Sequence, residues 1–159
     1  MTEANALIKR LAETSQTMVA AESCTGGLVA DLLVQVPGAS RVFWGSFVSY
    51  TVAAKVKMLG LEEDLIRRYG AVSEETACAM AQAALEQSAA DMAVAVTGLA
   101  GPQGDGSDTP LGTVWIGTVL RGEKSKARRF YYPLSREEVR IAAAKDAIRE
   151  LLAQASLNA

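Results

Sequence analysis

The segment TMVAAESCTGGLVADLLVQVPG, residues 17–38, decides the fold. Its opening run, residues 17–21, is short and apolar, which is typical of a buried strand. Two glycines at 26–27 then precede apolar residues that recur at helical spacing until the Pro-Gly pair at 37–38 ends the pattern. The segment therefore predicts a strand, a glycine turn and a helix, with Ser23 where the strand ends.

Helices and strands keep alternating on both sides of this segment. Further helices are expected at residues 3–15, 51–59, 61–69, 74–88 and from 136 onward, and further strands at 41–50, 91–98, 112–120 and 126–134. Only the turn RGEKS separates the last two strands, which favours an antiparallel hairpin. The pattern predicts an α/β fold, a three-layer α/β/α sandwich with a mixed central sheet, formed by a single domain over residues 1–159.

The composition excludes several classes of protein. The 159 residues fit one domain, and 50% of them are hydrophobic, enough for a sizeable core. A formal net charge of -2 with interspersed signs gives no basis for binding nucleic acid or an anionic membrane. No run approaches the roughly 20 apolar residues of a membrane span, and residues 1–13 predict a helix rather than a signal. We expect a cytoplasmic protein with reduced Cys24 and Cys78.

The sequence contains no histidine. Ser-His-Asp triads, Cys-His dyads within the chain and His-ligated zinc sites are therefore excluded, because each needs an imidazole. The two cysteines lack the spacing of metal ligands, so we expect neither a metal nor an organic cofactor. A base must come from Lys, Tyr, Asp or Glu, and a lysine can serve once burial lowers its pKa.

The first candidate motif is AESCTGG, residues 21–27, at the carboxyl end of a strand, where ligands gather in such folds. Backbone N–H groups at Thr25, Gly26 and Gly27 open the next helix and could hold an oxyanion or a phosphate. Ser23 would then be a nucleophile beside its own oxyanion hole. The same residues serve equally as a helix cap and a tight turn. Cys24 is the weaker nucleophile, because no imidazole can activate it.

The second candidate is Lys55 in YTVAAKVKMLG, residues 50–60. If Thr51 caps this helix, Lys55 lies at the edge of the buried stripe and Lys57 points to solvent. Partial burial would lower the pKa of Lys55 toward that of a general base, although a lysine that merely extends from a helix edge fits the spacing too. Tyr50 is either a packed aromatic residue or a phenol near the site. The buried stripe is expected to consist of Val52, Val56 and Leu59.

The third candidate is the loop TGLAGPQGDG, residues 97–106. Its glycines, including Gly98 and Gly101, allow a ligand to approach the backbone closely and can form concavities for anions. The loop lacks the lysine and the spacing of known phosphate-binding fingerprints. Arg136 and Arg140 follow in the first turns of the last helix, where an exposed pair beside acidic residues is the simpler interpretation.

Taken together, these segments resemble the CinA C-terminal domain family, also known as the competence/damage-inducible protein family. AESCTGG, GSFVSYTVAAKVKMLGL, GAVSEETACAMA and TGLAGPQGDGSDTPLGTVWIG occur in the order and spacing of that family and cover nearly the whole chain. The family includes amidohydrolases of the PncC type, which convert nicotinamide mononucleotide to nicotinate mononucleotide and ammonia in pyridine nucleotide recycling. The resemblance also implies a small homo-oligomer.

The resemblance implies a Ser-Lys dyad, which by position is Ser23 and Lys55, with Tyr50 close by. Thr97 and Arg140 match positions associated with substrate binding. In the implied reaction Lys55 takes the proton of Ser23, which attacks the amide, and the N–H groups around residues 25–27 hold the oxyanion. The glycine-rich loop, helix N-termini and Arg140 would hold the nucleotide's phosphate.

The chain departs from the family pattern around the expected site. Val52 stands where the family has asparagine, Asp105 where it often has glycine, and Thr109 where it has lysine. Leu134 and Ser135 replace a Gly-Asp pair. These changes leave two alternatives open: a catalytically impaired member that binds a nucleotide or a partner, or a Ser-Lys amidase for another small amide. The sequence does not connect the chain to competence or DNA damage.

Overall fold

The computed structural model describes residues 1–157 and has the predicted alternation of elements. Five strands form one sheet in the order β2-β1-β3-β4-β5. The strands are β1 (Met18–Glu22), β2 (Phe43–Val48), β3 (Met92–Gly98), β4 (Thr113–Leu120) and β5 (Lys126–Tyr131). The helices are α1 (Glu3–Thr14), α2 (Leu28–Val34), α3 (Val52–Leu59), α4 (Glu63–Tyr69), α5 (Glu74–Glu86) and α6 (Arg136–Leu157), with a 3-10 turn, η1, at Ala39–Arg41.

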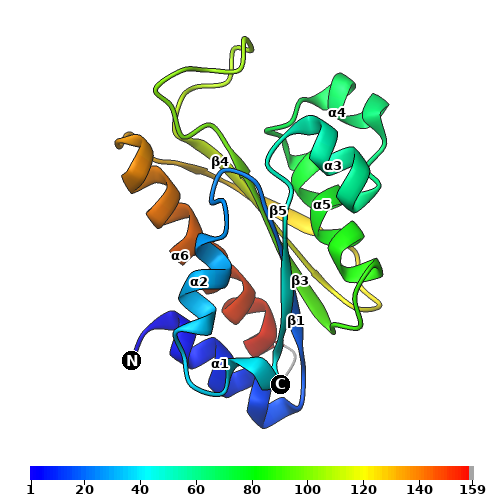
Figure 1. Cartoon of the computed structure of the whole chain (residues 1–159), viewed down its shortest axis with the longest axis vertical. Helices are drawn as coiled ribbons and strands as arrows, with labels where there is room; N and C mark the ends of the chain where they lie inside the picture. The colour runs from blue at the N-terminus through cyan, green and yellow to red at the C-terminus, as the bar shows by residue number, and fades with distance from the viewer. Residues whose placement is uncertain (158–159) are drawn as a thin grey trace.

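Helices cover both faces of the sheet (Figure 1). α1, α2 and α6 lie on one face, and α3, α4 and α5 lie on the other. Alternate residues of β3 face the two cores, because successive side chains of a strand point to opposite sides. Val94 and Val96 pack with the α1-α2-α6 side, and Ala93 and Ala95 with the α5 side. The predicted α/β/α sandwich is confirmed.

The direction of the strands brings three loops to one edge of the sheet. β1 is buried along its whole length and runs parallel to β2 and β3, so the carboxyl ends of all three strands meet. β4 runs antiparallel to β3, and β5 antiparallel to β4, which makes the sheet mixed and confirms the predicted hairpin. The loop from β3 to β4 rises beyond this edge (Figure 1).

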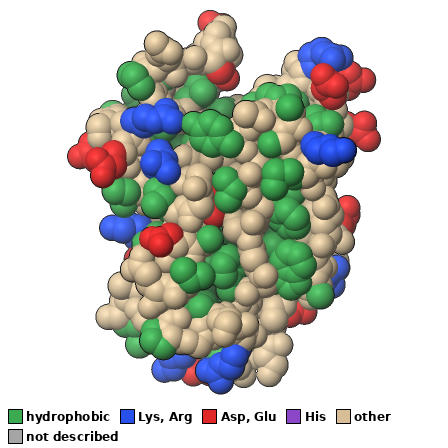
Figure 2. Space-filling view, viewed as in Figure 1, with side chains coloured by type: hydrophobic (Ala, Val, Ile, Leu, Met, Phe, Trp, Pro, Cys, Tyr) green, Lys and Arg blue, Asp and Glu red, His purple; other side chains and the backbone are tan. Residues whose placement is uncertain are grey.

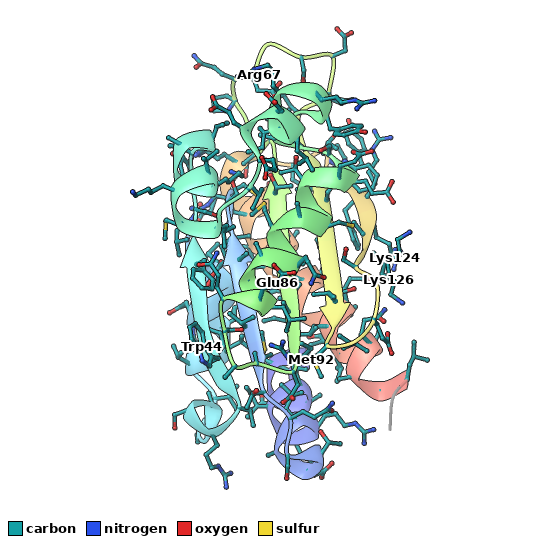
Figure 3. All side chains as sticks on the ribbon, turned by 90° about the vertical axis from the view of Figure 1, so that its right-hand side faces the viewer. Trp44, Arg67, Glu86, Met92, Lys124 and Lys126 are labelled. Carbon is teal, nitrogen blue, oxygen red and sulfur yellow. The ribbon has the colours of Figure 1, made fainter. Side chains whose placement is uncertain are left out.

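The two outer edges of the sheet differ in chemistry. Trp44 lies on the β2 edge, and Lys124 and Lys126 lie on the β4-β5 edge (Figure 3). On β2, which pairs on one side only, Trp44 is 50% exposed and Val48 40% exposed. Hydrophobic side chains run down this side of the molecule (Figure 2). Within residues 1–157 no helix is both long and apolar enough to span a bilayer.

In helix α3 the buried face differs from the predicted one. Thr51 caps it as predicted, its hydroxyl accepting from the N–H of Ala54 at 3.0 Å. Val52, expected to be buried, is 43% exposed, whereas Lys55, expected at the edge, is only 2% exposed. Lys57 is exposed, as predicted. The helix therefore turns its lysine, and not its first valine, toward the interior.

Candidate active site

A cavity of about 220 Å³ lies at the edge where the parallel strands end. The molecule is visibly hollowed at this end, between the β3-β4 loop and the α3-α4 region (Figure 2). Its walls come from the ends of β1, β2 and β3, from α3, from residues 71–72 before α5, and from the start of α6. The cavity brings together six of the predicted site residues: Ser23, Tyr50, Lys55, Thr97, Gly98 and Gly101. Thr25, Gly26, Gly27 and Arg140 do not line it.

Ser23 and Lys55 are in direct contact, 32 residues apart in sequence. Lys55 Nζ lies 2.9 Å from Ser23 Oγ and also donates to the carbonyl oxygens of Ser49 and Tyr50, at 3.1 and 3.4 Å. Among the described residues no carboxylate lies within 4 Å of the ammonium group. Burial without a counter-charge lowers the pKa of Lys55 from 10.5 to about 8.

This geometry orients the lone pair of the neutral amine. A neutral lysine has two N–H groups and one lone pair, and the Ser49 and Tyr50 carbonyls take both N–H groups. The lone pair is then left for the third neighbour, the hydroxyl of Ser23. Lys55 is consequently arranged to accept the serine proton, which is the geometry that a nucleophile and its base require.

Glu22, the residue before Ser23, holds the turn between β1 and α2 in place. Its side chain is fully buried, and its carboxylate accepts from the N–H groups of Gly27, Val29 and Ala30 at 3.1, 2.9 and 3.2 Å. The hydroxyls of Thr25 and Ser46 donate to the same carboxylate at 2.8 and 2.7 Å. A carboxylate is well suited to a helix N-terminus, where unpaired N–H groups and the helix dipole meet.

The role of Glu22 changes two expectations for the turn. Neither Ser23 nor Thr25 caps α2, because its N-cap is Gly27, whose φ is 105°. The N–H of Gly27, expected to face an oxyanion, is instead bonded to Glu22. The N–H of Gly26 donates to the carbonyl of Ser23 at 3.0 Å. The end of α2 is therefore already occupied by an anion of the protein itself.

Cys24 is poorly suited to act as the nucleophile. Its side chain is 7% exposed, and burial raises the pKa of its thiol to about 11. A thiol with that pKa is almost wholly protonated at neutral pH, and the thiolate is the reactive form. Its backbone N–H, in contrast, donates to no oxygen of residues 1–157. Within the same residues no three His, Cys, Asp or Glu side chains gather as metal ligands.

Arg140 holds the turn from the other side. Its Nε donates to the carbonyl of Cys24 at 2.9 Å, and its Nη2 to the carbonyl of Thr25 at 3.0 Å. Gly26, at φ 56°, leaves room for it, since a Cβ there would lie 3.3 Å from the guanidinium. The structure thus places Arg140 outside the cavity, where two of its donors bind the backbone of the turn that carries Ser23.

The arginine that reaches the cavity is Arg136, which the sequence interpretation treated as solvent-exposed. Its guanidinium donates to the carbonyl of Gly101 at 2.5 Å and to the hydroxyl of Tyr50 at 2.9 Å. The bond joins the β3-β4 loop to the rim residue Tyr50, whose side chain is 53% exposed. The spacing of apolar residues in α6 does not show that Arg136 faces the cavity, because a residue in the first turn of a helix can point either to solvent or to a neighbouring loop.

Two further predicted residues shape the floor of the cavity. Thr97 is buried, and its hydroxyl donates to the carbonyl of Ala71 at 2.7 Å, tying β3 to the segment before α5. At Gly98 a Cβ would lie 2.6 Å from Val114 Cγ2, so no side chain fits there. Of the departures from the family pattern, Val52 and Asp105 line this cavity, and Thr109 lines a neighbouring one.

Comparison with known proteins adds the family. Residues 2–155 match the family model described as the CinA C-terminal domain. The chain belongs to the CinA C-terminal domain family. A CinA-like protein of Akkermansia muciniphila is 45% identical over 147 residues, 92% of this chain and 36% of that protein. A CinA-like protein of Syntrophomonas wolfei is 41% identical over 138 residues, 87% of this chain and 33% of that protein.

Solved CinA structures share the fold. A CinA superfamily protein from Escherichia coli superposes with a TM-score of 0.91 at 35% identity, covering 94% of this chain and 87% of that one. A competence/damage inducible protein from Agrobacterium tumefaciens gives 0.88 at 37% identity, covering 96% of both chains. This chain thus spans about a third of the CinA-like proteins of A. muciniphila and S. wolfei, but nearly all of the A. tumefaciens structure.

Proposed function

We propose that this CinA domain is a cytoplasmic amidohydrolase that converts nicotinamide mononucleotide to nicotinate mononucleotide and ammonia. The observation that carries the proposal is the 2.9 Å contact between Lys55 Nζ and Ser23 Oγ inside a cavity. A lysine with a pKa near 8 is a competent base at neutral pH. Buried lysines without a counter-ion lower stability, and such perturbed groups are concentrated at functional sites.

In the first half of the proposed reaction, the neutral amine of Lys55 takes the proton of Ser23 Oγ. The oxygen attacks the amide carbon, and the C=O electron pair moves onto the carbonyl oxygen. When this intermediate collapses, the C–N bond breaks and Lys55 returns its proton to the leaving nitrogen, which departs as ammonia. The acyl group remains on Ser23, and Lys55 is neutral again.

In the second half, Lys55 takes a proton from water, and the resulting hydroxide attacks the acyl carbon. The bond from carbon to Ser23 Oγ breaks, and Lys55 gives the proton back to the serine oxygen. The products are a carboxylic acid, which ionises, and the regenerated dyad. One water is consumed and one ammonia released for each amide.

The backbone N–H of Cys24 is the best-supported donor for the oxyanion. It follows the nucleophile directly, Cys24 lines the cavity, and the N–H donates to no backbone oxygen of residues 1–157. An N–H at the position after the nucleophile forms half of the oxyanion hole in other serine hydrolases. This differs from the expectation for Gly27, whose N–H is bonded to Glu22.

The direct test is ammonia release from nicotinamide mononucleotide by purified protein, with Ser23→Ala as the matched control. We expect release by the wild type, none above background by the variant, and a serine-linked acyl-enzyme after rapid quenching. Release that survives Ser23→Ala would contradict the dyad and make Cys24 the next candidate.

A second candidate is a Ser-Lys amidase for another small amide, and Asp105 favours it. This carboxylate lines the cavity, and its bonds to the Ser107 N–H and hydroxyl, at 3.0 and 2.5 Å, hold the pKa of Asp105 below its usual value. A negative charge there disfavours an anionic substrate. A panel of neutral and phosphorylated amides separates the two candidates. Binding of the nucleotide without turnover by the wild type would instead indicate an impaired member that acts by binding.

We also propose that the domain works as a homo-oligomer. The open outer side of β2 supports this, since unpaired strand edges with exposed apolar side chains are usually covered. Light scattering of the purified protein, compared with Trp44→Lys, measures it. A wild-type mass equal to that of one chain would contradict it.

A further inference from the structure

A second cavity, of about 350 Å³, lies beside the candidate active site. It is formed by the start of β4, by β5, by the far end of the β3-β4 loop and by Val72, which precedes α5. This is the face of the sheet that α5 covers, where β4 and β5 run next to that helix (Figure 3). Its lining residues are Val72, Asp108, Thr109, Pro110, Thr113, Trp115 and Arg129.

The cavity contains a buried polar group without a partner. Thr113 is 1% exposed, and its hydroxyl oxygen has no hydrogen-bond partner among the described residues. Buried hydroxyls are normally satisfied, because leaving one unpaired costs about 1–3 kcal/mol. Thr113 therefore gives the wall of this cavity a hydroxyl whose hydrogen-bonding capacity the described residues do not use.

Arg129 supplies a positive charge that the protein itself leaves unused. Within residues 1–157 it forms no ion pair and no side-chain hydrogen bond, whereas its neighbour Arg128 pairs with Glu150 at 2.7 Å. Arg129 lies directly opposite Trp115 in the β4-β5 register, so both side chains leave the sheet on the same face. A cation beside a broad aromatic surface suits an anion carried on a ring.

The second cavity adjoins the first. Val72 lines both. Thr97 in the first cavity is the register partner of Trp115, which is in turn the partner of Arg129, so the three residues form one row across β3, β4 and β5. Adjacent strands lie about 4.8 Å apart, and the row therefore spans on the order of 10 Å.

We propose that this second cavity is a subsite for the phosphate ester of a substrate whose carboxamide lies at Ser23. The inference rests on the proposed function and adds the place where the substrate's distal end binds. Arg129 pairs with the phosphate, the Thr113 hydroxyl donates to it, and Trp115 packs against the sugar. Asp108, exposed at the rim, is suited to accept from sugar hydroxyls.

Three other groups that could hold a phosphate already have partners within the protein. Glu22 takes the N–H groups at the start of α2, and Arg140 is bonded to the carbonyls of Cys24 and Thr25. Arg136 reaches the first cavity but is bonded to Gly101 and Tyr50. Arg129 is the remaining cation that lines either cavity besides Lys55.

Binding can be measured without turnover by the fluorescence of Trp115. Trp44→Phe removes the second of the two tryptophans. Titration with ribose 5-phosphate should change this signal, and ribose should not. Arg129→Gln should weaken binding about 10- to 100-fold, because hydrogen bonds between charged groups contribute about 1.5–3 kcal/mol. Arg128→Gln, which removes the same charge from the opposite face, should change binding less than twofold.

Two further variants protect the test against misfolding. Thr113→Val should weaken ribose 5-phosphate binding while leaving the melting temperature equal or higher, because it removes an unsatisfied buried hydroxyl. Thr109→Lys should tighten binding, because it adds a cation to the same cavity. Loss of binding in Arg136→Gln with Arg129→Gln unaffected would overturn the proposal, as would the absence of any response to ribose 5-phosphate.

Kinetics separate this inference from the proposed function. If nicotinamide mononucleotide is hydrolysed, Arg129→Gln should raise its KM about 10- to 100-fold, and Arg128→Gln should change it less than twofold. An unchanged KM refutes the subsite and leaves the amidase intact. If no amide is hydrolysed but ribose 5-phosphate binds in an Arg129-dependent manner, the amidase fails and the subsite stands.

Discussion

Glu22 and Lys55 are both buried beside Ser23, but their surroundings differ. Glu22 precedes Ser23 in the sequence, and Lys55 contacts its hydroxyl. The Glu22 carboxylate accepts five hydrogen bonds, three of them from the start of α2. Lys55 donates to two carbonyls and a hydroxyl and has no carboxylate within 4 Å among residues 1–157. One charge is fully satisfied, and the other is left without a counter-charge.

The difference suits Glu22 to a structural role and Lys55 to the role of a base. A carboxylate that accepts hydrogen bonds from a helix end and from neighbouring hydroxyls holds those groups in place. An amine denied a counter-ion gives up its proton more easily and can act as a base. Each can be changed alone, so the comparison can be tested from both sides.

The largest effect is expected from removing the amine. Lys55→Ala should reduce turnover of the amide on the order of 10⁴-fold or more, because the serine loses its base. The double variant with Ser23→Ala should be no worse than either single one, since the two act as a unit. Lys57→Ala, an exposed lysine on the same helix, is the matched control in steady-state assays. Equal damage from Lys57→Ala would assign the base to the wrong lysine.

The second prediction concerns stability against pH. The folded-state pKa of Lys55, about 8, lies below its ordinary value of 10.5, so the unfolded chain binds the extra proton between these values. Stability from this group therefore rises from pH 8 to 10.5, and the penalty is fully present below pH 8. Relative to Lys55→Met, the wild type should gain about 3 kcal/mol between pH 7 and 10.5. Urea unfolding at both pH values measures it, and parallel curves for the two proteins would refute a depressed pKa.

Glu22→Gln tests the satisfied charge, with a smaller expected effect. Glutamine keeps the shape but presents an NH₂ where one carboxylate oxygen accepts from Ala30 and Ser46. We expect a loss of about 2 kcal/mol in the free energy of unfolding, from the unpaired N–H at the start of α2. Asp31→Asn, an exposed acidic residue of the same helix, is the control in urea unfolding. If both variants lose the same stability, the burial of Glu22 adds nothing.

Burial of Lys55 was the point at which sequence reasoning reached its limit. The strands, the glycine turn and most helix caps follow from local pattern, because apolar period and turn chemistry are local properties. A short helix such as α3 can rotate with little change in its apolar pattern, so the exposure of Val52 depended on tertiary packing. Ser23 and Lys55 were found by motif. Glu22 and Arg136 were missed, because hydrogen bonds from distant N–H groups or to a loop leave no trace in spacing.

The smallest effect is expected at the rim. Val52→Asn places a hydrogen-bonding side chain in the first turn of α3, the helix that carries Lys55, at a position that lines the cavity. A small improvement in the placement of Lys55 should raise kcat a few-fold and leave KM nearly unchanged, since misplacement by about 1 Å can cost roughly a hundredfold. Val56→Ile, on the same helix, is the control. A change in KM alone would show that position 52 contacts substrate rather than orienting the base.

The contacts that Arg136 and Arg140 of α6 make with the site also bear on the order in which the site forms during synthesis. Ser23 and Lys55 leave the ribosome well before Arg136 and Arg140, the two residues that hold the β3-β4 loop and the serine turn. A nascent chain that has made only its first strands carries Ser23 and Lys55 of the proposed dyad without the contacts that α6 makes to the turn after β1. The site is completed only when the last helix docks, so the appearance of activity during synthesis would report the moment at which the whole domain has folded.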